Sequence, residues 1–545
     1  MRRFHSYGPV DCRYHFCVAR QELIAQGVEQ LIGVPEVGGH YFTIWAPRQT
    51  GKTWLMRQIK QEISQRYPDR FTVFDFSLGG LRGMSFSPPS FERNSDLAIE
   101  TNSEESDFPG TFGELLQETL PGEPEVNSWK DFRKLFSRDK GQWDSPLILL
   151  IDEVDTIPSA LIDLMVAQFR ELYLHRETNW LHGLALIGVR AVLGIESQRG
   201  SPFNIQRSLR VPNFTIDEVK ELYRQYQEES GQKIEAAVVE KIYQTTKGQP
   251  GLVSWFGELL TEKYNPGQNQ IIDMDTWELV WHKARFVEPN NTVMNLIAKA
   301  RMPEYQKFLL ELFTRSDMPF SFHEPLCNYL YLHGIVESET TRRPNGELGE
   351  ICRFASPFIQ DCLYHALSRE IVGDRMPILP LQPLDDLADV FSGTSLDLSA
   401  LLQRYKDYLL RLKAKGINPW KEQPRRETDL HLTEAVGHFH LFTWLQTVLG
   451  RRCVISPEFP TGNGKVDIHI RCGAKRGIIE VKSFVDIYEA KSARKQAAQY
   501  AKSLGFEQVT VAMFVPVDDE TILEKLSAEE LIEDVQVKLV AIGWI

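Results

Sequence analysis

Long apolar runs, C-x-x-C cysteine pairs and an excess of basic residues are all missing from this 545-residue sequence. No stretch reaches the roughly 18 apolar residues that a membrane span needs, and the N-terminus has no apolar signal core. We therefore predict a cytoplasmic protein without membrane association. The 61 basic and 74 acidic residues give a formal charge of −13. This charge argues against non-specific coating of nucleic acid by the whole molecule, so any nucleic-acid site must be local.

Cysteine is scarce and shows no zinc-site spacing. The seven cysteines are Cys12, Cys17, Cys327, Cys352, Cys362, Cys453 and Cys472. An odd count without a close-spaced pair suits a reducing compartment. We therefore expect reduced, mostly buried thiols.

The length exceeds what one hydrophobic core supports, which predicts several domains. Apolar strand-like runs alternate with helical segments over residues 1–215, and this alternation is typical of a parallel α/β sheet. Within that range, residues 79–127 are rich in Ser, Pro, Gly and acids and would be an insertion. The further predicted parts are a helical lid (216–275), a winged-helix-like region (276–375), a linker with a basic helix (376–427) and a second α/β domain (428–545).

One hairpin candidate lies in the winged-helix-like region. It covers residues 335–354, with Pro344, Asn345 and Gly346 as its turn. Short helices on both sides of one such hairpin are typical of a winged-helix module, which is why we predict that fold for the region.

A phosphate-binding loop is the firmest motif. A strand-like run over residues 41–45 precedes it and a helical segment follows from residue 54. Such a loop needs a tight turn whose N–H groups converge on phosphates, then a Lys for their charge and a hydroxyl for Mg²⁺. The predicted nucleotide-binding residues are Ala46, Pro47, Arg48, Gln49, Thr50, Gly51, Lys52 and Thr53, with Ala46 standing where the strict pattern has glycine.

An acidic pair follows the continuous apolar run over residues 147–151. Asp152 would hold Mg²⁺ together with Thr53, and Glu153 would polarise the attacking water as a catalytic residue. The order of strand, loop, helix and later acidic strand makes a coincidental match improbable, at roughly one in twenty.

With Gly8-Pro9-Val10 and Gly248-Gln249-Pro250-Gly251, this loop resembles the AAA-like and STAND-type bacterial ATPases over residues 8–260. The resemblance implies ATP and Mg²⁺ as cofactors and a segment before the loop that lies against the adenine. It also allows a homo-oligomer that forms when ATP binds. It also implies a basic γ-phosphate sensor after the fourth strand. Arg190 occupies that place, and Arg199, Arg207 and Arg210 remain alternatives.

The C-terminal domain carries a second set of chemically suggestive residues. Asp467 lies in one apolar strand, and Glu480 and Lys482 lie on the next, two residues apart and hence on one face. Glu434 lies on an amphipathic helix predicted over residues 432–448 and would add a third carboxylate. Metal-dependent phosphodiester hydrolysis needs carboxylates on adjacent strands and a Lys that offsets developing charge.

This pattern resembles the PD-(D/E)XK nuclease superfamily over residues 428–520, although no Pro precedes Asp467. Gln496 and Tyr500 match the Q-x-x-x-Y spacing of a subset of these nucleases, and positions i and i+4 share one helix face. The resemblance implies Asp467, Glu480, Lys482, Gln496 and Tyr500 as catalytic residues. It implies Glu434, Asp467 and Glu480 as metal ligands. An E-x-K pair in an ordinary amphipathic strand, or a decayed fold that only binds nucleic acid, remains the alternative.

A basic stretch over residues 404–426 precedes this domain, with eight basic and two acidic residues interleaved with aromatics. We interpret it as a phosphate-contacting approach or, equally, as a solvated helix face.

These features predict an ATPase whose nucleotide state controls Mg²⁺-dependent cleavage of nucleic acid, most plausibly DNA. The resemblance links such fusions to defence or mobile-element biology. The alternative is a STAND-type ATP-dependent switch whose C-terminal domain binds a partner or DNA without cutting it. ATP-driven DNA remodelling is disfavoured because the sequence contains no helicase motifs.

Overall fold

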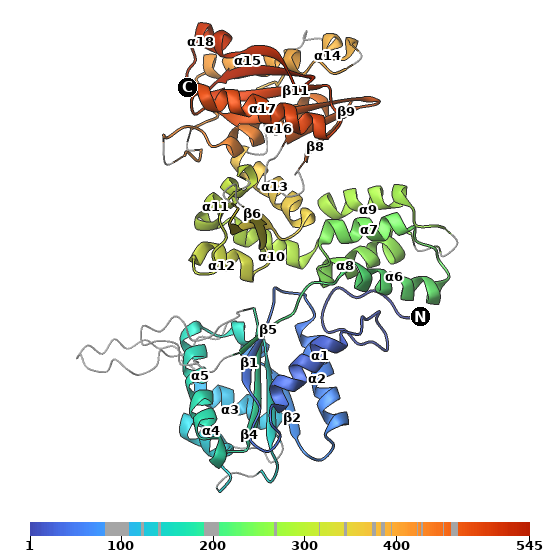
Figure 1. Cartoon of the computed structure of the whole chain (residues 1–545), viewed down its shortest axis with the longest axis vertical. Helices are drawn as coiled ribbons and strands as arrows, with labels where there is room; N and C mark the ends of the chain where they lie inside the picture. Colours follow the sequence, from blue (N-terminus) through green and yellow to red (C-terminus); the bar gives the residue numbers. More distant parts are fainter. Residues whose placement is uncertain are drawn as a thin grey trace, which may run out of the picture. The chain divides into compact units, whose positions relative to one another are not determined.

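The computed structural model forms two compact units, Met1–Glu288 with Leu332–Gly334 and Pro289–Tyr331 with Ile335–Ile545, each considered by itself (Figure 1). None of the helices in the described part of the chain is long and apolar enough to cross a membrane. The described residues are 1–81, 108–120, 125–139, 143–189, 207–265, 267, 270–315, 317–342, 346–372, 378–382, 387–393, 395–421, 423–426, 429–450, 452–458 and 467–544.

The first unit contains a five-stranded sheet in the order β2-β3-β4-β1-β5, with every pair parallel. This arrangement confirms the predicted parallel α/β fold. The middle strands are buried on both faces, which explains their continuous apolar runs. The strands are β1 (Tyr41–Trp45), β2 (Thr72–Ser77), β3 (Leu147–Asp152), β4 (Leu181–Gly188) and β5 (Arg207–Arg210).

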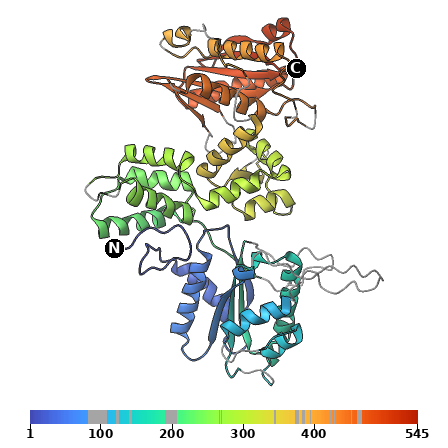
Figure 2. The ribbon, with the colours of Figure 1, turned by 180° about the vertical axis from the view of Figure 1, so that it is seen from behind.

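Helices cover both faces of this sheet (Figures 1 and 2). Ile148 and Leu150 of β3 pack towards α1 and α2, whereas Leu149 and Ile151 pack towards the other helices. This alternation follows from the two-residue period of a strand. The helices are α1 (Gln21–Ile32), α2 (Lys52–Arg66), α3 (Phe108–Thr119), α4 (Trp129–Leu135) and α5 (Ser159–Leu174).

The segment interpreted as an insertion contributes to this core. Within residues 79–127, the structure describes residues 79–81, 108–120 and 125–127. Phe112 and Leu116 of α3 are completely buried among core residues that include Leu149. Their spacing of four residues places both on one helix face, so this helix is part of the core.

A helical bundle follows the sheet in the same unit. Its first helix begins at a capping box, in which Thr215 and Glu218 satisfy each other's backbone N–H groups. A short π-helical turn, Leu259–Lys263, extends the third helix. The helices are α6 (Ile216–Ser230), α7 (Ala236–Thr246), α8 (Pro250–Glu258) and α9 (Met274–Phe286).

The second unit starts with short helices around a hairpin. β6 and β7 pair antiparallel from Val336↔Phe354 to Arg342↔Leu348, which confirms the predicted hairpin. Of its predicted turn, Gly346 has a φ of 87°, and Pro344 and Asn345 lie outside the described residues. The elements are α10 (Asn291–Ala300), α11 (Pro303–Thr314), α12 (Pro325–Leu332), β6 (Val336–Arg342), β7 (Leu348–Phe354) and α13 (Pro357–Val372).

The C-terminal sheet has six strands in the order β12-β13-β11-β10-β9-β8. β8, β9 and β10 form an antiparallel meander, and α17 makes the crossover to β11, which pairs parallel with β10. The strands are β8 (Val454–Glu458), β9 (Asp467–Cys472), β10 (Lys475–Ser483), β11 (Gln508–Val515), β12 (Ala528–Ile532) and β13 (Val535–Gly543). The helices are α14 (Ala388–Ser392), α15 (Leu398–Ala414), α16 (Glu434–Leu449), α17 (Ile487–Ser503) and α18 (Glu520–Leu526).

Helix α16 differs from its prediction. We expected an amphipathic helix, but Val436, Phe439 and Trp444 on different sides of it are all buried. The sheet strands β8 and β10 cover one side, and α11 and α13 pack against the helix as well. Packing on more than one side explains why most residues of this helix are buried, including His438 and His440.

The cysteine prediction is also wrong in part. Cys12 and Cys17 form a disulfide, and Cys453 and Cys472 form another, while Cys327, Cys352 and Cys362 are free and buried. The second pair joins the start of β8 to the end of β9, whose antiparallel register brings the two Cα atoms to 4.3 Å. The spacing of the cysteines in the sequence did not reveal this pair, because the two residues become neighbours only through the register of β8 on β9.

Candidate functional site

The phosphate loop joins β1 to α2 in the first unit. Ala46 is completely buried directly after the strand. Gln49 and Gly51 both adopt left-handed backbone, with φ values of 59° and 88°. Gly51 precedes the first residue of α2 and gives the sharp turn that a side chain would strain. The helix therefore begins with its N–H groups at the loop, as phosphate binding requires.

Lys52 folds back over this loop. Its Nζ donates to the carbonyl oxygens of Ala46 and Pro47, at 2.8 and 2.7 Å. Burial lowers the pKa of Lys52 to about 8, and the negative charges of Asp155 and Asp152 oppose that shift. The ammonium group is therefore still mostly charged at neutral pH, beside the start of α2.

Thr53 and Asp152 meet across the carboxyl ends of two strands. The Thr53 hydroxyl donates to Oδ2 of Asp152 at 2.6 Å, and Oδ1 of Asp152 accepts from the backbone N–H of Glu153 at 2.8 Å. Asp152 is buried. A hydroxyl and a carboxylate side by side are hard oxygen donors of the kind that Mg²⁺ prefers.

Glu153 is held in a fixed position. Its backbone is left-handed, with a φ of 55°, and its Oε2 accepts from the Ser77 hydroxyl at 2.8 Å. A Cβ added to Gly79 would lie 1.8 Å from the same Oε2, so this glycine leaves the room that the carboxylate occupies. Sequence reasoning missed Ser77 and Gly79. The signal was available, because both follow the predicted second strand at the edge where Asp152 ends β3.

Asp155 is a further acidic residue that sequence reasoning missed. Its carboxylate accepts from the backbone N–H of Val189 at the end of β4, and a Cβ on Gly188 would collide with it. Its charge is the largest one acting on the pKa of Lys52. Asp155 therefore contacts the end of β4 directly and acts on the lysine of the loop through its charge.

The predicted arginine sensors divide into two groups. Arg190 and Arg199 lie outside the described residues. Arg207 donates to Gln30 of α1 at 3.2 Å, and the guanidinium of Arg210 lies 5.5 Å from the ring centre of Trp45, the last residue of β1. Arg210 is thus the described candidate placed beside the start of the loop.

The turn before α8 contacts the phosphate loop directly. The side-chain amide of Gln249 donates to the carbonyl of Arg48 at 3.2 Å, and the N–H of Gly251 donates to the carbonyl of Gln49 at 3.0 Å. A Cβ on Gly251 would lie 2.6 Å from the Gln49 side chain. The helical bundle therefore supports the loop conformation.

In the second unit, the structure brings three predicted residues together. Lys482 Nζ lies 3.0 Å from Oε1 of Glu434, in the first turn of α16, and 3.2 Å from Oε1 of Glu480. Glu480 is only 2% exposed. A lysine between two carboxylates forms a compact ion-pair cluster in which one positive charge serves both negative ones.

The placement of Asp467 is described for its backbone alone. It is the partner of Glu480 in the β9–β10 register, and its side chain lies outside the described residues. Among the described side chains, no group of three or more His, Cys, Asp or Glu is placed to hold a metal ion. The predicted three-carboxylate metal site therefore stays a prediction.

Gln496 and Tyr500 lie on α17 as predicted, one turn apart. Ile478, two residues before Glu480, packs with Ala497 and Ala501 of this helix. Because side chains alternate along a strand, Glu480 points towards the face that α17 covers.

The basic stretch over residues 404–426 makes mostly internal contacts. Lys406 is buried and pairs with Glu520 at 2.7 Å, and Arg404 pairs with Asp389 at 2.8 Å. The others that the structure shows engaged are Lys413 with Asp518, Arg426 with Asp429, Arg411 with backbone carbonyls, and Arg425 over the Trp544 ring. These contacts stabilise the domain, so the stretch is a weaker candidate for phosphate contact than its composition indicated.

Comparisons with known proteins give one family-model match and a set of similar solved structures. Residues 419–520 match the family model described as "Domain of unknown function (DUF8371)". A comparison with curated proteins gives no match. Among solved structures, the chain is similar to the Walker-type ATPase PABY2304 of Pyrococcus abyssi, at 16% identity and a TM-score of 0.42, covering 66% of this chain and 99% of that one.

Two further solved structures are similar at lower scores. Thermotoga maritima RuvB has 15% identity and a TM-score of 0.33, covering 62% of this chain and 93% of its own. Drosophila ORC bound to DNA has 13% identity and a TM-score of 0.34, with 64% and 86% covered. Independently of these scores, the strand, loop and helix order and the parallel sheet give the first unit the architecture of a P-loop nucleotide-binding domain.

Proposed function

We propose that the first unit binds ATP with Mg²⁺ and hydrolyses it. The observation that carries this proposal is the 2.6 Å contact between Thr53 and Asp152, next to Lys52 at the start of α2. Lys52 would bind the β- and γ-phosphates, and Thr53 and Asp152 would hold the metal. When bound, Mg²⁺ supplies positive charge that offsets the charge of the transferring phosphate. Glu153, oriented by Ser77, would position the attacking water.

We also propose that the C-terminal domain cleaves phosphodiester bonds of nucleic acid, with DNA as the first substrate to test, under control of the nucleotide state. The cluster of Glu434, Glu480 and Lys482 supports this proposal, since a (D/E)-x-K strand pair and a helix carboxylate converge there. Glu434 and Glu480 would hold Mg²⁺ with Asp467. Bound metal supplies Lewis acidity, and Lys482 would orient water and offset developing negative charge.

A cleavage assay tests this second activity. Plasmid, single-stranded DNA and RNA are incubated with the protein and Mg²⁺, with and without ATP. We expect cleavage that is lost in the Glu480→Ala and Lys482→Ala double variant. Lys491→Ala, which removes an exposed lysine of α17 instead, is the matched control and should cleave normally. Cleavage that survives in the double variant would refute the nuclease proposal.

A non-cleaving regulatory domain is the second candidate, and one observation favours it. Lys482 contacts both carboxylates, so part of their negative charge is offset by a protein group. A structural cluster of this kind predicts no cleavage by the wild type on any substrate and a large loss of thermal stability in Lys482→Ala. Cleavage by the wild type, together with the thermal stability of the Lys482→Ala single variant, therefore separates the two candidates.

A further inference from the structure

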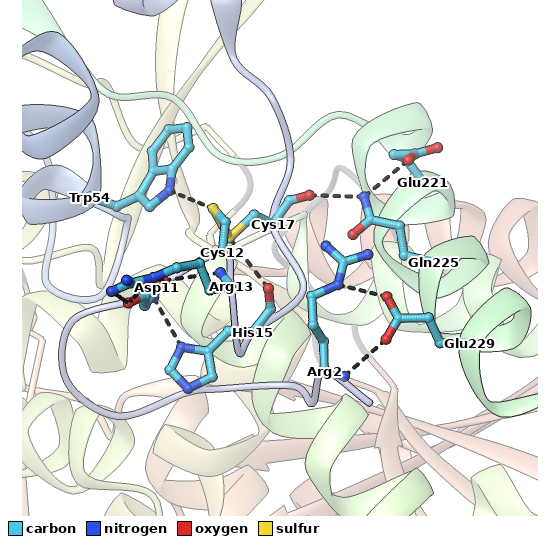
Figure 3. Close-up of a disulfide and its surroundings, with 10 residues drawn as sticks. All are labelled: Arg2, Asp11, Cys12, Arg13, His15, Cys17, Trp54, Glu221, Gln225 and Glu229. Atoms are coloured by element: carbon cyan, nitrogen blue, oxygen red, sulfur yellow. Dashed lines mark hydrogen bonds and ion pairs between the residues drawn. A yellow bond between two sulfur atoms is a disulfide. The ribbon is translucent and has the colours of Figure 1, made fainter. Parts of the chain in front are cut away.

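The N-terminal segment, residues 1–20, is fastened to the helical bundle of the first unit. Phe4 is buried, and its ring centre lies 4.8 Å from that of Tyr223 in α6. Arg2 forms an ion pair with Glu229 at 2.7 Å, and the Ser6 hydroxyl donates to Glu258 at 2.8 Å (Figure 3 shows the Arg2 pair). The start of the chain is therefore a strap on the bundle.

The Cys12–Cys17 disulfide lies where this strap also reaches the phosphate-loop helix. The indole N–H of Trp54 donates to Sγ of Cys12 at 3.3 Å, and Trp54 directly follows Thr53 in α2 (Figure 3). On the other side, the carbonyl of Cys17 accepts from the Gln225 amide in α6 at 2.9 Å. One short disulfide loop thus contacts both the nucleotide-site helix and the bundle.

We propose that the Cys12–Cys17 disulfide is a redox-sensitive clasp that holds the strap against α2 and raises the affinity of the first unit for nucleotide. Its effect on nucleotide binding rests on the ATP-binding function proposed above. The reactant is a dithiol, either a small molecule or a protein with two neighbouring thiols. The clasp is closed when oxidised and open when reduced.

The position of the bond makes it accessible to such a dithiol. Cys12 is exposed and Cys17 is half-buried. By contrast, Cys453 is buried and its bond to Cys472 joins adjacent strands of the C-terminal sheet. Exposed disulfides are reduced more easily than buried ones. The two bonds of this chain should therefore differ in their rates of reduction.

The exchange proceeds in two balanced steps. A thiolate of the dithiol attacks Sγ of Cys12, a mixed disulfide forms, and Cys17 leaves as a thiolate that takes a proton from water. The second thiolate of the dithiol then attacks its own sulfur in the mixed disulfide, and Cys12 leaves. The dithiol is oxidised to a disulfide while the two cysteines are reduced to thiols. The Trp54 N–H lies beside the sulfur that leaves last, so it stabilises the Cys12 thiolate only until that sulfur takes a proton from water and becomes a weakly accepting thiol.

Opening the bond removes the link between the two contacts. In the oxidised chain, the disulfide keeps the Cα atoms of Cys12 and Cys17 at 5.5 Å. Trp54 contacts Cys12 at one end of this closed loop, and Gln225 contacts Cys17 at the other. In the reduced chain, the Cys12 side can leave α2 while the Cys17 side stays on the bundle. The strap then no longer restrains α2 relative to α6, so nucleotide binding must itself order these elements and becomes weaker.

The first experiment measures ATP-analogue affinity of the full chain, oxidised and after treatment with dithiothreitol. Differential alkylation and mass spectrometry assign the redox state of each cysteine. We expect reduction of the Cys12–Cys17 bond to weaken binding by about fivefold or more. The Cys12→Ser and Cys17→Ser double variant should bind weakly in both conditions, and a Cys453→Ser and Cys472→Ser control should keep the full response. Equal affinity of oxidised and reduced wild type would overturn the proposal.

A second measurement does not depend on nucleotide. Trypsin should cut after Arg13, inside the disulfide loop, several-fold faster in the reduced protein than in the oxidised one. Trp54→Phe, which removes only the N–H donor, should shift the reduction midpoint of this bond. If neither form binds nucleotide but tryptic cleavage responds to reduction, the ATP-binding proposal fails and the clasp stands. An unchanged cleavage rate refutes the clasp itself.

Discussion

At the scale of single residues, the position and the charge of Lys52 both depend on the groups that surround it. It follows the left-handed Gly51, donates to two loop carbonyls and lies in the field of Asp152 and Asp155. Its charge therefore depends on its surroundings as well as on its type. The loop was predictable because glycine, lysine and threonine occur at fixed spacing, and Asp152 because it ends an apolar run. Asp155 lies in the turn after that strand, and no sequence pattern linked it to the loop.

Removing this lysine should abolish ATP turnover. We expect Lys52→Ala to lower the hydrolysis rate at least about a hundredfold, because preorganised charge at a transferring phosphate has effects of that order. Lys60→Ala, on the same helix but paired with Asp75, is the matched control and should hydrolyse ATP normally. The measurement is phosphate release. Unchanged turnover in Lys52→Ala would contradict the assignment of the loop.

The lowered pKa of Lys52 predicts a pH dependence of binding. With a pKa of about 8, Lys52 loses its proton as pH rises through that value, so ATP affinity of the free protein should fall between about pH 7 and 9. Folding stability should rise as pH increases from about 8 to 10.5. In that range the unfolded chain still binds the lysine proton, whereas the folded state, with its lowered pKa, has released it. Titrations across this range, with Lys52→Arg as the variant that stays charged, check the prediction. A flat profile in the wild type would contradict it.

Ser77 makes a distinct prediction. Ser77→Ala removes the hydroxyl that holds Glu153 at 2.8 Å without touching the phosphate loop. We expect kcat to fall about tenfold, because a hydrogen bond that positions Glu153 is lost, and nucleotide affinity to change little. Thr72→Ala, in which a hydroxyl at the far end of the same strand is removed, serves as the control. A pure affinity loss in Ser77→Ala would place Ser77 in binding instead.

At the scale of elements, α16 shows what a one-dimensional pattern misses. Helical spacing located this helix to within two residues, but it could not show that α11 and α13 pack against the helix in addition to the sheet. The strands of the first sheet were easier to predict than this helix, because buried strands such as β3 are continuous apolar runs in the sequence. The disulfides and the contact of Ser77 with Glu153 depend on which strands become neighbours. That information lies in tertiary packing, so sequence patterns alone could not supply it.

The burial of α16 also predicts acid sensitivity of the C-terminal domain. Burial lowers the pKa of His440 to about 4, and the Tyr405 hydroxyl lies 2.6 Å from its Nδ1. The unfolded chain binds this proton near pH 6.5, so stability is lost as pH falls from about 6.5 to 4, by about 3 kcal/mol. His440→Gln keeps a partner for Tyr405 but cannot titrate. Denaturation at pH 7 and 4.5 should show a smaller loss in this variant, and an equal loss would contradict the assignment.

At the scale of the whole molecule, the central proposal is a coupling between two chemistries on one chain. The first unit carries the phosphate loop, and the second carries the cluster around Lys482. If nucleotide state controls the C-terminal domain, then binding at the two sites is linked by a coupling free energy. Linkage is reciprocal: the factor by which ATP changes DNA affinity must equal the factor by which DNA changes ATP affinity.

This reciprocity can be measured before any cleavage is assayed. We expect a non-hydrolysable ATP analogue to change DNA affinity about fivefold or more, and DNA to change analogue affinity by the same factor in the same direction. Glu480→Gln should keep DNA bound uncut during the titrations, because it retains the size of the side chain but loses its charge. Lys52→Ala should remove the effect of the analogue while leaving DNA affinity at its nucleotide-free value. Affinities that do not respond to each other in either direction would show that the two units act independently.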